Sequence, residues 1–247
     1  MYAANPEKAK RAAWLMSRLH AFDLLRFGIN VDCLPVLDVP IEGASNVIGD
    51  RAYGMEPVIV TEMGRAAAAG LKAGGVLPVM KHIPGHGRGF ADSHHNLPIV
   101  DTPLDELMTH DFPPFMALKD ELMAMSAHVV FSAIDPDHPA TTSRKVIGDI
   151  IRGLIGFDGL LMSDDVSMNA LHGTIGERAR AIAASGIDMI LHCNGVMAEM
   201  QQVAAEANWL SGKAAERAAC VEAAFGKNDG VDEAAVRAEF EAIMAIA

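Results

Sequence analysis

The sequence predicts an α/β fold of the (β/α)8 TIM-barrel type, because strand-like and helix-like segments alternate along most of its 247 residues. The strand-like segments are short, continuous apolar runs, which is typical of parallel strands buried on both faces. Polar side chains follow these runs at Asp38, His82, His128, Asp164 and Asn194. Active sites of such folds form at the carboxyl ends of the strands, so these positions agree with the predicted architecture.

The elements are expected in a regular order. An amphipathic helix over 6–27 opens the chain, since Asn5 can cap it, Pro6 suits its first turn and Gly28 can end it. Strands are then expected at 29–39, 76–82, 124–131, 159–163 and 189–193. Helices are expected at 57–73, 104–119, 144–154 and 175–185, and a helical tail rich in Ala and Glu closes the chain.

This order provides about five βα units, whereas a closed barrel needs about eight. The chain also begins on a helix, before any strand, which favours a barrel that lacks its N-terminal part. We therefore expect one domain over residues 1–247, an incomplete barrel with open edges at 29–39 and 189–193. Unpaired edges invite pairing, so self-association through them is expected.

Charge and apolar patterning exclude two classes of partner. The formal net charge is −12 with no block of like charges, which argues against nucleic acid and against an anionic membrane surface. No uncharged apolar run reaches about 18 residues, so no membrane-spanning helix is predicted.

The first helix and the cysteines indicate the cellular compartment of the protein. The helix carries Glu7 and Lys8 near its start, unlike the apolar region of a secretory signal. The cysteines, Cys33, Cys193 and Cys220, are odd in number and far apart, so they are expected to be reduced thiols of a cytoplasmic protein.

A loop rich in His and Gly follows the second predicted strand. Its chemistry-bearing side chains are Lys81, His82, His86, Arg88, Asp92, His94 and His95. A solvated polar loop is the simple alternative, but glycines among the histidines favour a ligand site because they permit close approach. A carboxylate at Asp92 near the His94 imidazole would fix its tautomer and favour proton donation and uptake. Alternatively, Asp92 only bonds the amides of a turn.

Two further segments carry candidate groups. Asp164 and Asp165 end a predicted strand, where a carboxylate can attack an anomeric carbon or bind a metal. Neighbours on a strand point to opposite faces, so only one of them should enter a site, and helix capping is the alternative for the other. Arg51 has a fork of donors for a substrate hydroxyl or carboxylate, or it bridges structurally to Asp50 or Asp38.

A metal-dependent hydrolase remains an alternative. Its ligands would come from His82, His86, His94, His128 and Asp164. No His-x-His motif follows the first strand, and the cationic Lys81 beside His82 disfavours a metal.

The motifs in this order resemble the bacterial β-N-acetylglucosaminidases of glycoside hydrolase family 3, the NagZ type, over essentially the whole chain. The segments that carry the resemblance are LPVLDV (34–39), VIGDR (47–51), KHIPGHG (81–87), DSH (92–94), AHV (127–129), GFDG (156–159) and SDDVSM (163–168). The Lys-His and Ser-Asp segments occur across the wider family. The Asp-Ser-His segment marks the N-acetylglucosaminidase branch.

The resemblance implies a catalytic (β/α)8 barrel domain and a retaining glycosidase. Asp164 would be the nucleophile that forms a glycosyl-enzyme, and His94, polarised by Asp92, the general acid and base. The implied substrate-binding residues are Arg51, Lys81, His82, His128 and Met168, with Asp165 as a second, structural carboxylate.

The implied substrate is N-acetylglucosamine β-1,4-linked to anhydro-N-acetylmuramic acid, with or without its peptide, in cytoplasmic peptidoglycan recycling. No cofactor or metal is implied. The family's barrel normally opens with further βα units, and the last of these ends in an Asp-Gln-Glu-Gly-Gly-type segment that this sequence lacks. We therefore expect a truncated domain that is less stable and less active than a complete one. An inactive sugar-binding fragment and a phosphate-accepting enzyme remain alternatives.

Overall fold

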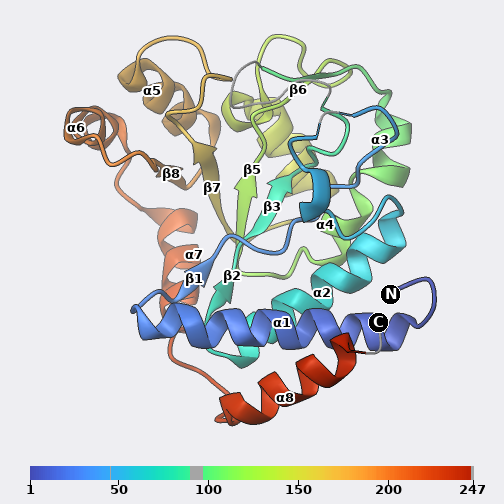
Figure 1. Ribbon diagram of the computed structural model, residues 1–247. Coiled ribbons are helices and arrows are strands. Elements are labelled where there is room, and N and C mark those ends of the chain that lie inside the picture. The colour runs from blue at the N-terminus through green and yellow to red at the C-terminus, as the bar shows by residue number, and fades with distance from the viewer. Residues whose placement is uncertain (45, 90–96, 246–247) are drawn as a thin grey trace.

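The structure is a computed structural model, and it describes residues 1–44, 46–89 and 97–245. Figure 1 shows helices packed around a central fan of strands. The helices are α1 (Pro6–Arg26), α2 (Pro57–Ala73), α3 (Leu104–His110), α4 (Pro113–Ala117), α5 (Ile175–Ser185), α6 (Met197–Glu206), α7 (Gly212–Glu222) and α8 (Glu233–Met244). Shorter or wider helical segments are η1 (Gly49–Arg51), η2 (Ala140–Thr142) and the π-helix η3 (Val146–Leu154).

The strands are β1 (Val31–Asp32), β2 (Leu77–Pro78), β3 (Met80–Ile83), β4 (Ile99–Val100), β5 (Met123–Ser126), β6 (Val130–Phe131), β7 (Leu160–Asp165) and β8 (Met189–Leu191). The central sheet has the order β3-β5-β7-β8, and every pair in it is parallel. β1 pairs with β2 in parallel, and a bridge between Val36 and Lys81 continues this pairing beside β3. The predicted parallel α/β sheet is therefore confirmed.

The barrel is not closed within the part of the chain that the structure describes, because β8 pairs there only with β7, and β1 only with β2. These are the edges expected from the sequence. Each of the five predicted strand segments contains observed strand pairing, at β1, at β2 with β3, at β5 with β6, at β7 and at β8.

Three details differ from the sequence-based expectation. The helix expected over 104–119 is divided into α3 and α4, because Pro113 and Pro114 lack the N–H groups that would continue it. The helix expected over 144–154 is a π-helix that begins at Val146. β4 pairs with β6 beyond the end of β5, and two such short strands have no clear periodic pattern.

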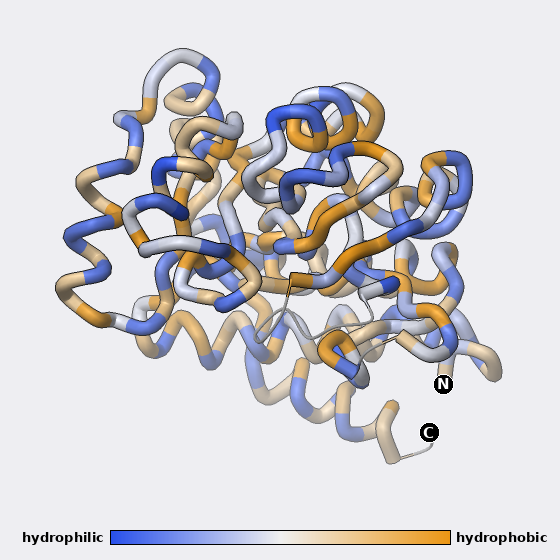
Figure 2. The backbone as a smooth tube through the Cα atoms, turned by 90° about the horizontal axis from the view of Figure 1, so that it is seen from above, coloured by the Kyte–Doolittle hydropathy of each residue, from blue (hydrophilic) through white to orange (hydrophobic). Residues whose placement is uncertain are grey.

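The two faces of the sheet bury different residues, as strand alternation requires. Ala124 and Leu161 pack with buried side chains of α2, α4, η3 and α5 in the main core. Met123, Met125 and Leu160 point to the opposite face, where Val221 of α7 packs against them. Seen from above, apolar segments run through the interior and the peripheral helices alternate apolar with polar residues (Figure 2). Helix α7 thus covers part of the face that would line the inside of a closed barrel.

Helix α1 lies between α2 and α8 (Figure 1). It approaches α2 closely at Gly70, where an added Cβ atom would lie 2.2 Å from the carbonyl oxygen of Trp14. Since that oxygen belongs to the backbone, α1 would have to move to admit a methyl group. Glycine at this position therefore sets the distance between the two helices.

We expect Gly70→Ala to lower the free energy of unfolding by about 1–3 kcal/mol, the usual cost of overpacking. Urea unfolding monitored by circular dichroism would measure this. Gly148→Ala is the matched control, because an added Cβ atom at Gly148 meets no atom within 4 Å. An equal loss of stability in both variants would show that helix spacing is not the cause.

Candidate active site

Asp164 and several of the other predicted functional side chains line a cavity of about 170 Å³ beyond the carboxyl ends of β3 and β7. Its walls are formed by Val47, Ile48, Arg51, Lys81, His82, His86, Asp164 and Met168. Four of the five substrate-binding residues expected from the resemblance line this cavity together with the expected nucleophile. The location agrees with the rule that α/β sites form at the carboxyl ends of parallel strands.

Asp164 lies near the end of β7 with 16% of its side chain exposed. Burial alone would raise the pKa of its carboxyl group. The charges of His82 and His128 and the N–H of the next residue outweigh burial, so this pKa lies below its ordinary value. The carboxylate is therefore ionised at neutral pH, which is the form that can act as a nucleophile.

Asp165 has a different environment. Its carboxylate accepts hydrogen bonds from the N–H of Ser167 at 3.0 Å and from the N–H of Cys193 at 3.2 Å. The Ser167 hydroxyl donates a further hydrogen bond at 2.5 Å. These contacts connect the end of β7 to the segment after β8. Of the two carboxylates, Asp164 lines the cavity and Asp165 does not.

His82 lies at the end of β3 between two carboxylates. Its Nδ1 is 2.7 Å from Oδ2 of Asp38, and its Nε2 is 4.0 Å from Oδ2 of Asp164. Asp38 is fully buried and also accepts the backbone N–H groups of His82 and His86, at 3.2 and 2.7 Å. Burial alone would raise the pKa of the Asp38 carboxyl. The charge of His82 and the hydrogen bonds that His82 donates to this carboxylate lower the pKa overall.

The loop after β3 depends on a close backbone contact at Gly87. An added Cβ atom there would lie 2.0 Å from the carbonyl oxygen of Val39, so only glycine fits. The contact holds the loop against the segment that carries Asp38. Arg88, just after Gly87, forms ion pairs with Asp111 and Glu106, at 2.7 and 2.8 Å.

His128 was expected to line the pocket, but the structure places it behind Asp164. It is fully buried, its Nδ1 lies 2.8 Å from the Thr141 hydroxyl, and its Nε2 lies 3.0 Å from the carbonyl oxygen of Asp165. Both ring nitrogens are therefore used within the protein. The charge of a protonated His128 lowers the pKa of the Asp164 carboxyl. Burial, in turn, lowers the pKa of the His128 imidazole.

Arg51, Lys81 and Met168 occupy the cavity wall. Arg51, at the end of η1, donates a hydrogen bond to the carbonyl oxygen of Val47, not to the Asp50 or Asp38 carboxylates considered from the sequence. Arg51 is an exposed residue that lines the cavity. Guanidinium and ammonium groups are suitable donors to sugar hydroxyls.

The expected acid and base residues, Asp92 and His94, lie outside the described residues. Within the described ranges, no group of three or more His, Cys, Asp or Glu side chains is placed to hold a metal ion. The metal-dependent alternative therefore gains no support from this part of the chain.

The sequence placed Asp38 at a strand end and His86 in the loop that favours a ligand site, but it predicted no individual role for either, apart from a possible metal ligand at His86. His86 lines the cavity, with 3% of the residue exposed. Its position in the KHIPGHG motif was the available signal. For Asp38 the signal was a charged residue inside an apolar run, which is costly unless the charge is hydrogen-bonded.

Comparison with known proteins decides the family. The model of the glycosyl hydrolase family 3 N-terminal domain matches residues 2–222. This chain belongs to that family. A curated relative named beta-hexosaminidase from Alkalilimnicola ehrlichii is 39% identical over 198 residues, which cover 78% of this chain and 56% of the relative. The corresponding protein of Chromobacterium violaceum is 40% identical over 195 residues, with coverages of 77% and 54%. The chain thus spans about half the length of these relatives.

Two solved structures are similar to this chain over nearly its whole length. NagZ from Neisseria gonorrhoeae in complex with N-trifluoroacetyl-D-glucosamine has a TM-score of 0.78 and 32% identity, with 96% of this chain and 68% of that chain covered. A family 3 β-N-acetylglucosaminidase from Paenibacillus has a TM-score of 0.80 and 28% identity, with coverages of 96% and 50%. The TIM-barrel type of fold predicted from the sequence is therefore confirmed, in the open form described above.

Proposed function

We propose that this family 3 chain is a retaining β-N-acetylglucosaminidase. The observation that carries the proposal is the placement of an ionised carboxylate, Asp164, on a cavity wall that also holds Arg51, Lys81 and His82. This arrangement offers a nucleophile to an anomeric carbon and hydrogen-bond donors to the hydroxyls of the same sugar. Relatives named beta-hexosaminidase, and a structural neighbour solved with an N-acylated glucosamine, support the sugar class.

In the proposed reaction, an Asp164 oxygen forms a bond to the anomeric carbon while the glycosidic bond breaks. The imidazolium of His94 donates its proton to the leaving oxygen, and Asp92 stabilises that imidazolium. Water then attacks the glycosyl-enzyme and gives its proton to the neutral imidazole, which releases Asp164 as a carboxylate. Two displacements at one carbon retain the β configuration. A neutral imidazole as the base avoids a second anion beside Asp164.

We propose peptidoglycan fragments as the substrate, with N-acetylglucosamine β-1,4-linked to anhydro-N-acetylmuramic acid, and the cytoplasm as the compartment. The described cysteines, Cys33, Cys193 and Cys220, are all free thiols, which agrees with a reducing compartment. The structure has no helix, within the residues it describes, that is long and apolar enough to cross a membrane. The edges at β1 and β8 are the surfaces through which two chains would associate.

The test is hydrolysis of 4-nitrophenyl N-acetyl-β-D-glucosaminide by the chain, measured as release of 4-nitrophenolate. We expect turnover, and we expect proton NMR to detect the β anomer of N-acetylglucosamine first. The matching 4-nitrophenyl β-D-glucoside serves as the control substrate and should react more slowly, because it lacks the acetamido group.

Other outcomes would contradict the proposal in different ways. Saturable binding of N-acetylglucosamine without turnover would indicate a sugar-binding fragment. Turnover that depends on added phosphate would indicate a phosphorylase. Initial release of the α anomer would exclude Asp164 as a nucleophile in two displacements.

A further inference from the structure

Asp38 is the most deeply buried carboxylate near the cavity, and it does not line the cavity itself. None of its surface is exposed, and both of its oxygens accept hydrogen bonds. Oδ2 faces Nδ1 of His82, while Oδ1 accepts the N–H groups of His82 and His86. A buried charge is stable only with such partners, so the backbone around it is built to keep a carboxylate there.

The strand pairing explains how Asp38 reaches His82. Val36 bridges to Lys81, and the N–H of Leu37 donates to the carbonyl oxygen of Lys81 at 2.7 Å. Asp38 follows Leu37 on one segment, and His82 follows Lys81 on the other. The register of two neighbouring segments therefore brings the carboxylate and the imidazole together.

The hydrogen bond to Asp38 decides which nitrogen of His82 carries a fixed proton. An ionised carboxylate only accepts, so Nδ1 of His82 must donate at their separation of 2.7 Å. Nε2 is then the nitrogen on the cavity side, where it lies 4.0 Å from Oδ2 of Asp164. A proton on Nε2 would make an imidazolium between the two carboxylates.

We propose that Asp38 is a positioning residue of this site, which fixes the Nδ1 proton of His82 and turns Nε2 of His82 toward Asp164 and the sugar. The proposal rests on the proposed function, in which Asp164 is the reacting carboxylate. Asp38 itself touches neither the cavity nor the substrate. It acts by holding the Nε2 side of the His82 ring in front of Asp164, where the charge of a protonated ring lowers the pKa of the Asp164 carboxyl.

Other titratable groups of the described residues also lie around Asp164 and act on its pKa or share its cavity. They are Arg51 from η1, Lys81 and His86 from β3 and its loop, His128 after β5, Asp165 on β7, Cys33 after β1, and Cys193 after β8. Burial raises the pKa values of both thiols, so they stay neutral near pH 7. Burial lowers the pKa values of His86 and His128. His82 is the imidazole with a buried carboxylate at its second nitrogen.

The test is Asp38→Asn, which preserves size. One amide oxygen can accept the backbone N–H groups of His82 and His86 only if the amide nitrogen faces Nδ1 of His82. Nδ1 would then accept, and a second proton on the ring would be disfavoured. We expect kcat on the aryl N-acetylglucosaminide to fall by about 10²-fold, the scale on which carboxylate partners of functional histidines act. The acidic limb of the pH profile of kcat/KM should move to higher pH, because Asp164 loses a nearby positive charge.

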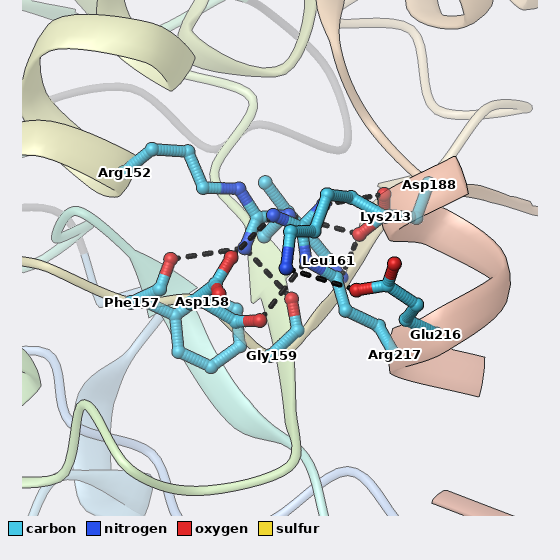
Figure 3. A network of polar contacts seen from close by, with 9 residues as sticks. All are labelled: Arg152, Phe157, Asp158, Gly159, Leu161, Asp188, Lys213, Glu216 and Arg217. Carbon is cyan, nitrogen blue, oxygen red and sulfur yellow. Dashed lines mark hydrogen bonds and ion pairs between the residues drawn. The ribbon is translucent and has the colours of Figure 1, made fainter. Parts of the chain in front are cut away.

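Two controls separate positioning from simple support of the fold. Asp188→Asn alters another buried carboxylate, which accepts from Arg152, Arg217 and the N–H of Leu161 at the opposite end of the strands (Figure 3). It should lower the unfolding temperature without moving the acidic limb. In a His82→Gln background, Asp38→Asn should have little further effect on kcat, since the residue through which it acts is gone. An unchanged acidic limb in Asp38→Asn, or equal losses in both backgrounds, would overturn the proposal.

A spectroscopic measurement tests the protonation of Nδ1 of His82 directly, without an activity assay. In ¹⁵N-histidine-labelled wild-type protein, the proposal predicts an Nδ1–H ring resonance, assigned by its loss in His82→Gln, that persists across neutral pH. An unprotonated Nδ1 on His82 would overturn the proposal even if the enzyme were fully active. Absence of turnover with the predicted resonance present would instead contradict the proposed function and uphold the role of Asp38.

Discussion

Replacing Asp164 with asparagine is expected to lower turnover of 4-nitrophenyl N-acetyl-β-D-glucosaminide by about 10⁴-fold or more, the scale for loss of a catalytic nucleophile. The amide has nearly the same shape, so the cavity and its sugar-binding donors should remain. It cannot form the glycosyl ester on which retention depends. Steady-state kinetics on purified protein would measure the loss. Binding of N-acetylglucosamine, followed by calorimetry, should persist in the variant, because the donors on the cavity wall are unchanged.

Asp165→Asn is the matched control, since it changes the adjacent carboxylate in the same way. Asp165 accepts from Ser167 and Cys193 and does not line the cavity. We expect its loss to lower stability, through weaker hydrogen bonds at the end of β7, and to lower turnover far less than Asp164→Asn does. Near-normal turnover in Asp164→Asn would refute the assignment of the nucleophile. A larger loss in Asp165→Asn than in Asp164→Asn would exchange the roles of the two carboxylates.

Most of the fold was predictable because its elements have strong periodic patterns and end signals. Helices α2 and α5 begin and end at the predicted residues. Thr174 and Glu177 form a capping box at the start of α5, a signal that is visible in the sequence. The π-helix η3 was not predictable, since the apolar spacing of its residues does not distinguish it from an α-helix. The packing of α7 against the face that a complete barrel would enclose was not predictable either, because it depends on which strands are present.

The site was predictable where residue type and chain position agreed. Asp164 and His82 follow buried strands, so their meeting at one edge of the sheet follows from parallel topology. The depth of His128 was not predictable, because the chain after β5 turns inward and Thr141, from a distant segment, occupies one of its nitrogens. The pairing of Asp38 with His82 was not predicted, because the two residues are 44 positions apart and only strand register brings them together.

A polar network at the opposite end of the sheet joins elements that the sequence does not connect (Figure 3). Asp188, just before β8, accepts from Arg152 of η3 at 2.8 Å and from Arg217 of α7 at 3.0 Å. It also accepts the N–H of Leu161 on β7 at 2.9 Å. Arg217 further forms an ion pair with the exposed Asp158. One buried carboxylate therefore connects η3, β7 and α7 to the start of β8.

Asp188→Ala is expected to lower the free energy of unfolding by about 3–5 kcal/mol, the usual cost of removing one partner from a buried ion pair. The side chain of Asp188 is 5% exposed, and those of Arg152 and Arg217 are 17% and 16% exposed. Arg217 would keep Asp158 as a hydrogen-bonded carboxylate partner, whereas Arg152 would keep hydrogen bonds to the carbonyl oxygens of Phe157 and Gly159 and its contact with the Phe157 ring. Urea unfolding of the variant and the parent chain, monitored by circular dichroism, would measure the difference.

Glu216→Ala is the control for this network, because Glu216 pairs with Lys213 on the same helix at 2.9 Å and both side chains are mostly exposed. Solvent screens such a pair, so its loss should cause no measurable change. An equal effect of the two variants would mean that Asp188 adds no more than surface charge does. A large effect of Asp188→Ala alone, with α7 becoming sensitive to protease before the sheet unfolds, would show how the open sheet keeps its apolar face covered. The ion pair between Arg217 and Asp188 would then be the interaction that holds α7 against Met123, Met125 and Leu160.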